Sequence, residues 1–276
     1  MFVADIALAK EDAMEEVALW AGASEEIDDA PGYEDPRDKE RKWTVNIGLT
    51  GGVSPDYEGS NNYGFGYNPN FALSWRDTIF YKGKTLGVNL INNKNLKAGP
   101  VMSWTSGRDE DDNDKLEGLG DVDSSIEVGG FLSYRQKPFR FKMEARQDAD
   151  SGHEGALVEL SAGKNLTFEK PLVFIALGTT WASDNYMESF FAVDAQQSAD
   201  SGLKKYDADA GIKDVSISMT SGYRITNRWR IGGKLEYKRL VGDAADSPIV
   251  DDENQFLAGI SLSYHMGSKI LPESLQ

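Results

Sequence analysis

The sequence predicts an all-β protein: a transmembrane antiparallel up-and-down β-barrel of about 12 strands. Three observations support this fold class. Apolar residues recur at every second position over long stretches, aromatic residues gather near the ends of those stretches, and short connections alternate with long ones. A membrane-spanning helix is excluded because the chain has no run of 18 uncharged apolar residues.

The alternation is clearest from Tyr63 to Trp75. Its odd positions hold Tyr63, Phe65, Tyr67, Pro69, Phe71, Leu73 and Trp75, whereas Gly, Asn, Ala and Ser occupy the even positions. Successive side chains of a strand point to opposite faces, so one face of this segment is apolar and aromatic. A β-sandwich would bury that face, but aromatics at both ends are typical of a strand that meets the two interfaces of a bilayer.

The same pattern and the turn residues between segments define the other strands. We expect strands at 43–52, 63–75, 78–82, 86–91, 96–104, 126–135, 139–146, 154–164, 171–182, 211–225, 228–239 and 255–266. Pro100 has no backbone N–H, so a bulge is expected near it. The short connections are 76–77, 92–95, 136–138, 165–170 and 226–228, and all fall at one end of the predicted barrel. The connections at the other end are mostly long, an asymmetry typical of bacterial outer-membrane barrels.

Charged residues occupy the positions opposite the apolar residues in three of these strands, 139–146, 211–225 and 228–239. Since a charge on the lipid face costs roughly 2–4 kcal/mol at mid-membrane, these side chains are predicted to face the lumen. They are Arg140, Lys142, Glu144, Arg146, Arg224, Arg230, Lys234, Glu236 and Lys238.

Large aromatic residues near the strand ends are interpreted as anchors at the membrane interfaces. They are Trp43, Trp75, Trp104, Trp181, Trp229 and Tyr264. Burial of these residues in a soluble core would require a second sheet, for which the chain has no strands left.

Charge and composition divide the chain into three parts. Residues 1–42 form an acidic segment that is expected to be disordered, with one short helix near 11–20; the barrel spans 43–266, and 267–276 is a short extension. Residues 1–40 hold 13 Asp and Glu against 3 Lys and Arg, a net charge of -10 out of -16 for the chain. This excess of negative charge argues against nucleic acid as a partner. We predict no cofactor, because the chain has no Cys and only two His.

Several stretches, taken together and in order, resemble the MltA-interacting protein (MipA)/OmpV family of outer-membrane proteins. They are SPDYEGSNNY (54–63), LGVNLI (86–91), KAGPVMSWTSGRDEDDNDKLEGLGDVDSSIEVGGF (97–131), EARQDADSGHEG (144–155) and WASDNYMESFFAV (181–193). The resemblance covers roughly residues 43–266. It implies a barrel in the outer membrane of a Gram-negative bacterium, in contact with lipid and lipopolysaccharide.

The resemblance also implies a function. Like the protein after which the family is named, the chain would be a non-enzymatic scaffold that links a lytic transglycosylase to a murein synthase. Short turns and the acidic terminal segment would supply the contacts with such periplasmic enzymes. Two alternatives remain open: a narrow pore or receptor, since a twelve-stranded barrel has room for a channel, and an adhesin that binds through its long loops.

The loop at 108–123 contains a candidate site for a divalent cation. Asp109, Asp111, Asp112 and Asp114 offer the oxygen ligands that hard cations prefer, and a bound ion would bridge the protein and lipopolysaccharide phosphates. The spacing does not match an EF-hand loop. The alternative is that these carboxylates pair with lumen arginines or remain solvated.

His153 lies close to Ser151 and Glu154 in SGHEG, and Ser, His and acidic residues form the catalytic set of some outer-membrane enzymes. Such groups must meet in space through a hydrogen bond between nucleophile and base, which closeness in sequence does not establish. We therefore predict a hydrogen-bonding role for His153 and no enzymatic activity.

Overall fold

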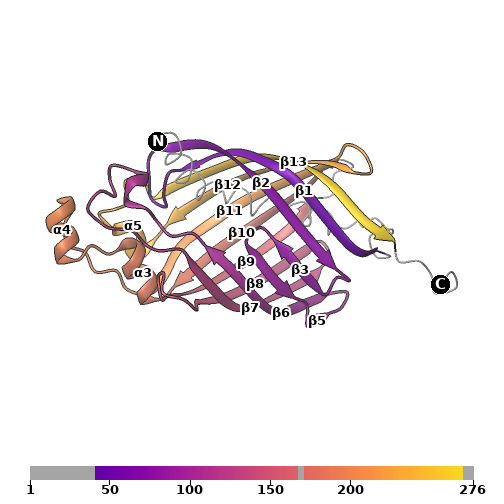
Figure 1. Cartoon of the computed structure of the whole chain (residues 1–276), viewed down its shortest axis with the longest axis horizontal. Coiled ribbons are helices and arrows are strands. Elements are labelled where there is room, and N and C mark those ends of the chain that lie inside the picture. Colours follow the sequence, from indigo (N-terminus) through magenta and orange to yellow (C-terminus); the bar gives the residue numbers. More distant parts are fainter. Residues whose placement is uncertain (1–40, 167–170, 270–276) are drawn as a thin grey trace.

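The computed structural model describes residues 41–166 and 171–269, and these form a β-barrel (Figure 1). All strand pairings in the barrel are antiparallel, and sequential strands are neighbours almost throughout. The strands are β1 (Arg41–Pro55), β2 (Tyr63–Trp75), β3 (Ile79–Lys82), β4 (Thr85–Val88), β5 (Ile91–Asn92), β6 (Leu96–Thr105), β7 (Ser125–Gln136), β8 (Phe139–Asp148), β9 (Ala156–Leu166), β10 (Leu172–Ala182), β11 (Gly211–Arg224), β12 (Trp229–Leu240) and β13 (Asn254–Lys269).

Two pairings close the ring: one joins the first strand to the last, and the other skips one short strand. β1 pairs with β13, and β4 pairs with β6, while the two-residue β5 adds to the edge of β6. Leaving β5 aside, twelve strands form the closed wall, which confirms the predicted fold class and strand number. None of the helices in the described ranges is long and apolar enough to cross a membrane.

The first and last strands are longer than the sequence pattern indicates. β1 begins at Arg41 instead of Trp43, and β13 continues to Lys269, past the predicted end of the barrel at Met266. These extra residues pair with each other, Arg41 opposite Lys269, so backbone pairing extends both strands where the apolar alternation has stopped. The rest of the acidic segment, with its expected helix at 11–20, lies outside the described residues.

A short hairpin, β3–β4, completes the wall between β2 and β6. It pairs with β2 over Ala72–Trp75 and with β6 near Val101. The bulge expected near Pro100 is absent from the pairing of β6 with β7, which is continuous. The break is instead in the facing chain: β4 ends at Val88 and β5 begins at Ile91, on either side of the point where Pro100 lacks a donor.

The two faces of the wall differ in polarity as predicted. Within β2, Tyr67 is 72% exposed, whereas the next residue, Asn68, is 5% exposed. Apolar residues such as Leu177 and Ile260 cover the outer surface, and polar residues such as Thr50 face inward. The lining of the barrel is therefore polar, so the packed apolar core must lie elsewhere.

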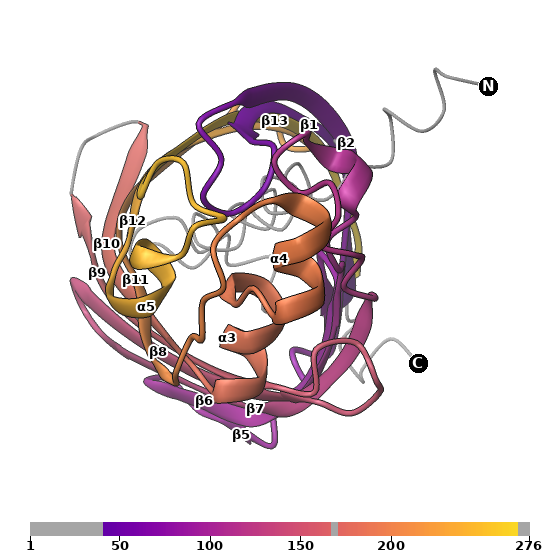
Figure 2. The same cartoon turned by 90° about the vertical axis from the view of Figure 1, so that its left-hand side faces the viewer.

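That core lies at one end of the barrel, in the long loops. We call this the long-loop end and the opposite one the short-turn end. The helices α3 (Asp184–Phe191), α4 (Ala195–Ser201) and α5 (Gly242–Asp246) gather there. Viewed from this end, they lie across the mouth of the ring (Figure 2). None of these three helices was predicted.

Two clusters of buried apolar residues hold the loops together. One combines α3 and α5 with the ends of β9, β10 and β12; its members are Leu157, Ala182, Tyr186, Met187, Phe191, Ala208, Leu240 and Ala244. The other joins four separate loops through Tyr57, Leu116, Leu119, Val193 and Ile249. We call these packed loops the cap, comprising residues 56–62, 106–124, 149–155, 183–210 and 241–253.

The outward face of β10 offers a test of the membrane assignment. Leu177 is 62% exposed at the middle of β10. Leu177→Lys is expected to lower the free energy of unfolding by about 2–4 kcal/mol, because the ammonium group would face lipid. Ala176→Lys, one residue earlier and directed into the lumen, should cost less. Urea unfolding in phospholipid vesicles, followed by tryptophan fluorescence, measures both. Equal losses would contradict the assignment of the faces.

Candidate functional site: the capped lumen

A buried ion-pair cluster fixes the first cap loop to the barrel wall. Lys213 Nζ lies 2.6 Å from Glu58 Oε1 and 2.8 Å from Asp214 Oδ2, and the Lys213 side chain is only 5% exposed. Lys238 Nζ approaches the same Glu58 oxygen at 3.6 Å. The Lys213 ammonium also lies 5.9 Å from the ring centre of Tyr186 in α3. Since a buried charge is tolerated only when it is paired, this cluster holds loop and wall in one arrangement.

A second buried cluster links the loop at 149–155 to β7 and β8. His153 Nδ1 accepts the Gly155 N–H at 3.0 Å, so the ring proton is on Nε2, which donates to Glu127 Oε1 at 3.1 Å. The other Glu127 oxygen accepts from Arg146 at 2.8 Å. Both ring nitrogens of His153 are thereby engaged, and neither is available to activate Ser151. The arrangement fits the hydrogen-bonding role predicted for His153.

The loop around His153 is wound tightly about one carboxylate. Asp148, the last residue of β8, accepts backbone N–H groups of Asp150, His153 and Glu154 at 2.7–2.9 Å. Beside it, a Cβ on Gly155 would lie 2.5 Å from the backbone nitrogen of Tyr186, so only glycine permits this close approach of α3. Loop and helix therefore form one packed unit.

Hydrogen bonds between loops complete the cap. Tyr57 donates its hydroxyl to the Ile249 carbonyl at 3.0 Å, and burial raises the pKa of this phenol, which keeps it a donor. Arg108 donates to the Phe190 carbonyl at 2.9 Å. Ser247 donates to the carbonyl at the end of α3, at 2.6 Å. These bonds join four of the long loops to one another across the long-loop mouth.

The nine predicted lumen charges all lie on the inward face. Each alternates with exposed residues such as Phe141 and Leu235. Several of them form ion pairs with near neighbours: Lys142 and Arg146 contact Glu144 at 2.9 and 3.2 Å, and Lys234 contacts Glu236 at 2.8 Å. Arg146 also bonds Glu159 of β9.

The predicted aromatic anchors lie in two sets, one near each end of the wall. Trp43 is opposite Trp75, and Trp229 is opposite Tyr264, all at the short-turn end. Trp104 and Trp181 lie near the long-loop ends of β6 and β10; all five tryptophans are between 36% and 57% exposed. Arginines of the short turns contact two of the rings: Arg76 lies 5.1 Å from the Trp75 ring centre, and Arg228 donates to the Tyr264 hydroxyl at 2.6 Å.

The acidic loop uses its carboxylates to organise its own backbone. Asp109 caps a short 3-10 helix, η2 (Glu110–Asp112), by accepting the Asp111 N–H at 2.9 Å. Glu110 accepts the N–H groups of Gly118 and Gly120 at 3.0 Å each. Within the described residues, no group of three or more Asp, Glu or His side chains is arranged to hold a metal ion.

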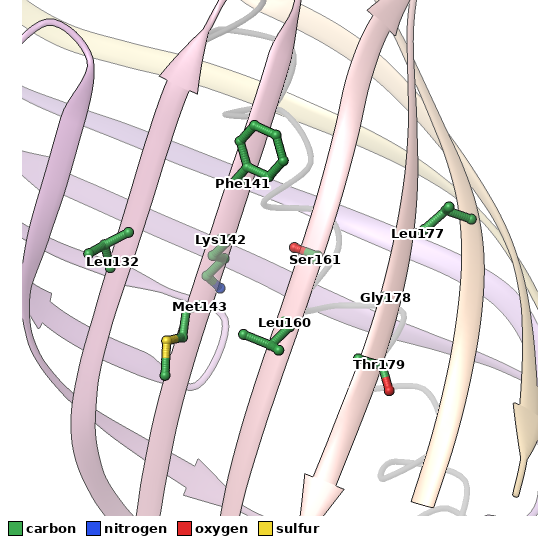
Figure 3. Close-up of a pocket in the computed structure, with 9 residues that line it drawn as sticks. All are labelled: Leu132, Phe141, Lys142, Met143, Leu160, Ser161, Leu177, Gly178 and Thr179. Carbon is green, nitrogen blue, oxygen red and sulfur yellow. The ribbon is translucent and has the colours of Figure 1, made fainter. Parts of the chain in front are cut away.

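A groove also lies on the outer wall, between β7 and β10 (Figure 3). Outward apolar side chains line it, including Leu132, Met143, Leu160 and Leu177. Lys142, Ser161 and Thr179 also contribute to its lining. The groove is therefore separate from the candidate site formed by the cap and the lumen.

Sequence reasoning missed the residues that join cap and wall. Glu58, Glu127 and Lys213 were not singled out, because their partners are distant in sequence; Glu58 and Lys213 are 155 positions apart. One local signal was present. The alternation in β11 is interrupted between Ile212 and Asp214, which places both Lys213 and Asp214 inward, and the structure has an irregularity in strand pairing there.

The Glu127 cluster gives a prediction about stability. Glu127→Ala removes the acceptor of both His153 and Arg146, and we expect a loss of about 1–3 kcal/mol in the free energy of unfolding. Glu253→Gln is the matched control, because its pair with Arg239 is exposed and should be worth less than about 1 kcal/mol. Urea titration of both variants in detergent micelles measures the difference. A Glu127 variant as stable as the control would show that the cluster is energetically neutral.

Comparison with known proteins agrees with this architecture. The family model of the MltA-interacting protein MipA matches residues 47–266. The putative outer membrane protein YiaT of Escherichia coli (strain K12) is 26% identical over 207 residues, which are 71% of this chain and 83% of that protein. The MltA-interacting protein of the same strain is 22% identical over 192 residues, covering 68% and 77% of the two chains.

A solved outer membrane channel of Pseudomonas putida F1 can be superimposed on 84% of this chain and 99% of its own, with 12% identity and a TM-score of 0.42. The family model spans most of the barrel, from β1 to β13, in the order of segments that first suggested the resemblance. The chain therefore belongs to the MltA-interacting protein (MipA) family and is a β-barrel of the outer membrane of a Gram-negative bacterium.

Proposed function

We propose that this barrel is a non-enzymatic scaffold that holds murein-remodelling enzymes, such as a lytic transglycosylase and a murein synthase, at the outer membrane. The name of one relative, the MltA-interacting protein, supports a murein enzyme as partner. The observation that carries the proposal is the cap: a packed apolar core across one mouth suits a rigid anchor better than an open passage.

The orientation follows from the lengths of the connections. Barrels of this class place short turns in the periplasm and long loops outside the cell. The short-turn end, with the beginning of β1 and the end of β13, would then face the murein layer. Exposed Lys94 and Lys137 in two of these turns would be accessible to a periplasmic enzyme.

The side chains at both rims support anchoring in the bilayer. The tryptophan and tyrosine rings of the two aromatic sets would lie at the interfaces with lipid and lipopolysaccharide. Arg76 and Arg228, next to rings of the short-turn set, suit contacts with lipid phosphates. His153, held between Glu127 and Gly155, supports the non-enzymatic assignment.

Pull-down from detergent-solubilised envelopes, followed by mass spectrometry, tests the partner. We expect a murein hydrolase or synthase to be enriched with the full chain. Lys94→Glu combined with Lys137→Glu should reduce that enrichment several-fold, because it reverses the charge of two short turns. Lys204→Glu with Lys205→Glu, exposed in the cap, is the matched control and should have no effect. Absence of any murein enzyme from the unmodified pull-down would contradict the scaffold.

Conductance separates the scaffold from a pore. In planar lipid bilayers the full chain should produce no steady single-channel openings, because the packed cap lies across the long-loop mouth. Steady openings at moderate voltage would support a channel and reject the scaffold as the whole function. A barrel of known conductance, inserted under the same conditions, verifies the assay.

A further inference from the structure

One stretch of the barrel wall lacks a neighbouring strand. β2 pairs with β1 over Tyr63–Trp75, but its other edge pairs with β3 only over Ala72–Trp75. Among the described residues, no strand pairs with that edge over the nine residues Tyr63–Phe71, which we call the open edge of β2. At a tilt of about 40°, neighbouring strands are displaced along one another by only about 4 Å, so tilt does not account for this difference in length. The ring is thus closed by a hairpin that covers only the short-turn part of β2 (Figure 1).

The strand register shows which backbone groups are directed to the open edge. Arg76 donates its N–H to the Lys42 carbonyl, and the pairing continues from there without a shift, so even-numbered residues of β2 bond to β1. Odd-numbered residues direct their N–H and C=O groups to the open edge. Pro69 is one of them, and proline is tolerated in a strand where its missing N–H faces such an edge. At membrane depth, backbone groups without a strand partner require a polar or water-containing space beside them.

The tip of the hairpin is attached to β6 and the cap, not to the open edge. Gly83 adopts a positive φ of 58° in the tight turn between β3 and β4. The Lys84 carbonyl accepts the Trp104 N–H at 3.1 Å, and Lys84 Nζ donates to the Ser106 hydroxyl at the start of the cap loop. The hairpin is therefore a fixed border of the open edge, and the outer end of β2 stays uncovered by it.

Polar and aromatic side chains meet at the open edge from opposite faces of β2. Phe65 and Tyr67 are 65% and 72% exposed on the outer face. Asn68 and Asn70 are buried on the inner face, where Asn70 donates to the Thr50 hydroxyl at 3.0 Å. Because no described strand continues the wall there, the lipid-facing rings and the polar lumen border the same edge. Such a border suits a molecule that has a polar head and a hydrocarbon chain.

We propose that the open edge of β2 is a lateral binding site for a single-chain amphiphile of the membrane, of the class of long-chain fatty acids, in the leaflet on the long-loop side. Its carboxylate accepts backbone N–H groups at the edge and reaches the polar lumen beside Asn68 and Asn70. Its hydrocarbon chain stays in lipid against Phe65 and Tyr67. This inference goes beyond the scaffold role and does not depend on it, because the site is in the wall and away from the short turns.

The position of the edge favours this occupant over a strand from another protein. An added strand would need a continuous row of donors and acceptors, and Pro69 interrupts the row of donors. The outer face of β2 meets lipid, so amphiphiles dissolved in the membrane reach the edge directly. The cap lies across the long-loop mouth, which leaves the wall as the approach to the lumen from this side.

Binding of a spin-labelled fatty acid tests the proposal. The full chain is reconstituted in phosphatidylcholine vesicles that contain stearic acid with a nitroxide on its chain. Electron paramagnetic resonance then measures the fraction of the probe that is immobilised. Phosphatidylcholine with the same nitroxide reports the lipid that surrounds any barrel. We expect the chain to immobilise the fatty acid in excess of the labelled phosphatidylcholine, and equal immobilisation of the two probes would overturn the proposal.

Two double variants locate the bound fatty acid. Phe65→Ala with Tyr67→Ala should reduce the excess immobilisation by about fivefold, because two rings of the contact are lost. Leu235→Ala with Ile260→Ala is the matched control. These side chains are also exposed on the outer face, but they belong to β12 and β13, which are paired along both edges. The control should leave the excess unchanged, and equal reductions by the two double variants would contradict the assigned site.

Proline substitutions test whether the edge is open, independently of any ligand. Tyr67→Pro removes an N–H that is directed to the open edge, so the barrel should still fold, as judged by its shift in gel mobility on heating. Asn68→Pro removes an N–H that bonds to β1 opposite Thr50 and should prevent folding. Failure of both variants to fold would show that the edge is paired and would overturn the proposal. Dimers of the unmodified chain that Tyr67→Pro dissociates would assign the edge to a second copy and reject the amphiphile.

Discussion

The structure depends on one constraint. Every strand must form its backbone hydrogen bonds with its neighbours around the ring, while its side chains alternate between the lipid outside and the polar lumen inside. Tyr67 and Asn68 show it within two residues, one exposed to the outside and the other buried within. A shift of one residue in strand pairing would exchange the faces and turn charges such as Arg140 towards lipid. The wall consequently tolerates little variation in register, and specific function is left to the ends.

This constraint explains which parts of the fold could be predicted. Alternation with a period of two is a local signal, so the strands of the barrel follow from the sequence alone. At the outer ends of β1 and β13 the apolar alternation stops, but the pairing between the two strands continues. β1 and β13 continue to Arg41 and Lys269 because each is the other's partner there. Pro100 was correctly recognised as a position without a donor, but the facing chain accommodates it by ending β4 and starting β5.

The cap could not be predicted for the opposite reason. α3 has eight residues and α4 seven, too short to be stable alone. α3 forms because Met187 and Phe191 are buried against other loops, and α4 is tied to the acidic loop by Gln197, which donates to the Leu119 carbonyl at 2.7 Å. Glu58 meets Lys213 only once the barrel is closed. Such contacts leave no periodic trace in the sequence. The interrupted alternation before Asp214 was the available clue, since an inward-facing lysine next to an inward-facing aspartate requires a partner on the same side.

The two ends of the lumen are therefore rigid in different ways. At the long-loop end, rigidity comes from an apolar core and buried ion pairs, which exist only when several loops are packed together. At the short-turn end it comes from the wall itself, because Arg135, Arg140, Arg224 and Arg230 cannot leave the lumen unless a charge enters lipid.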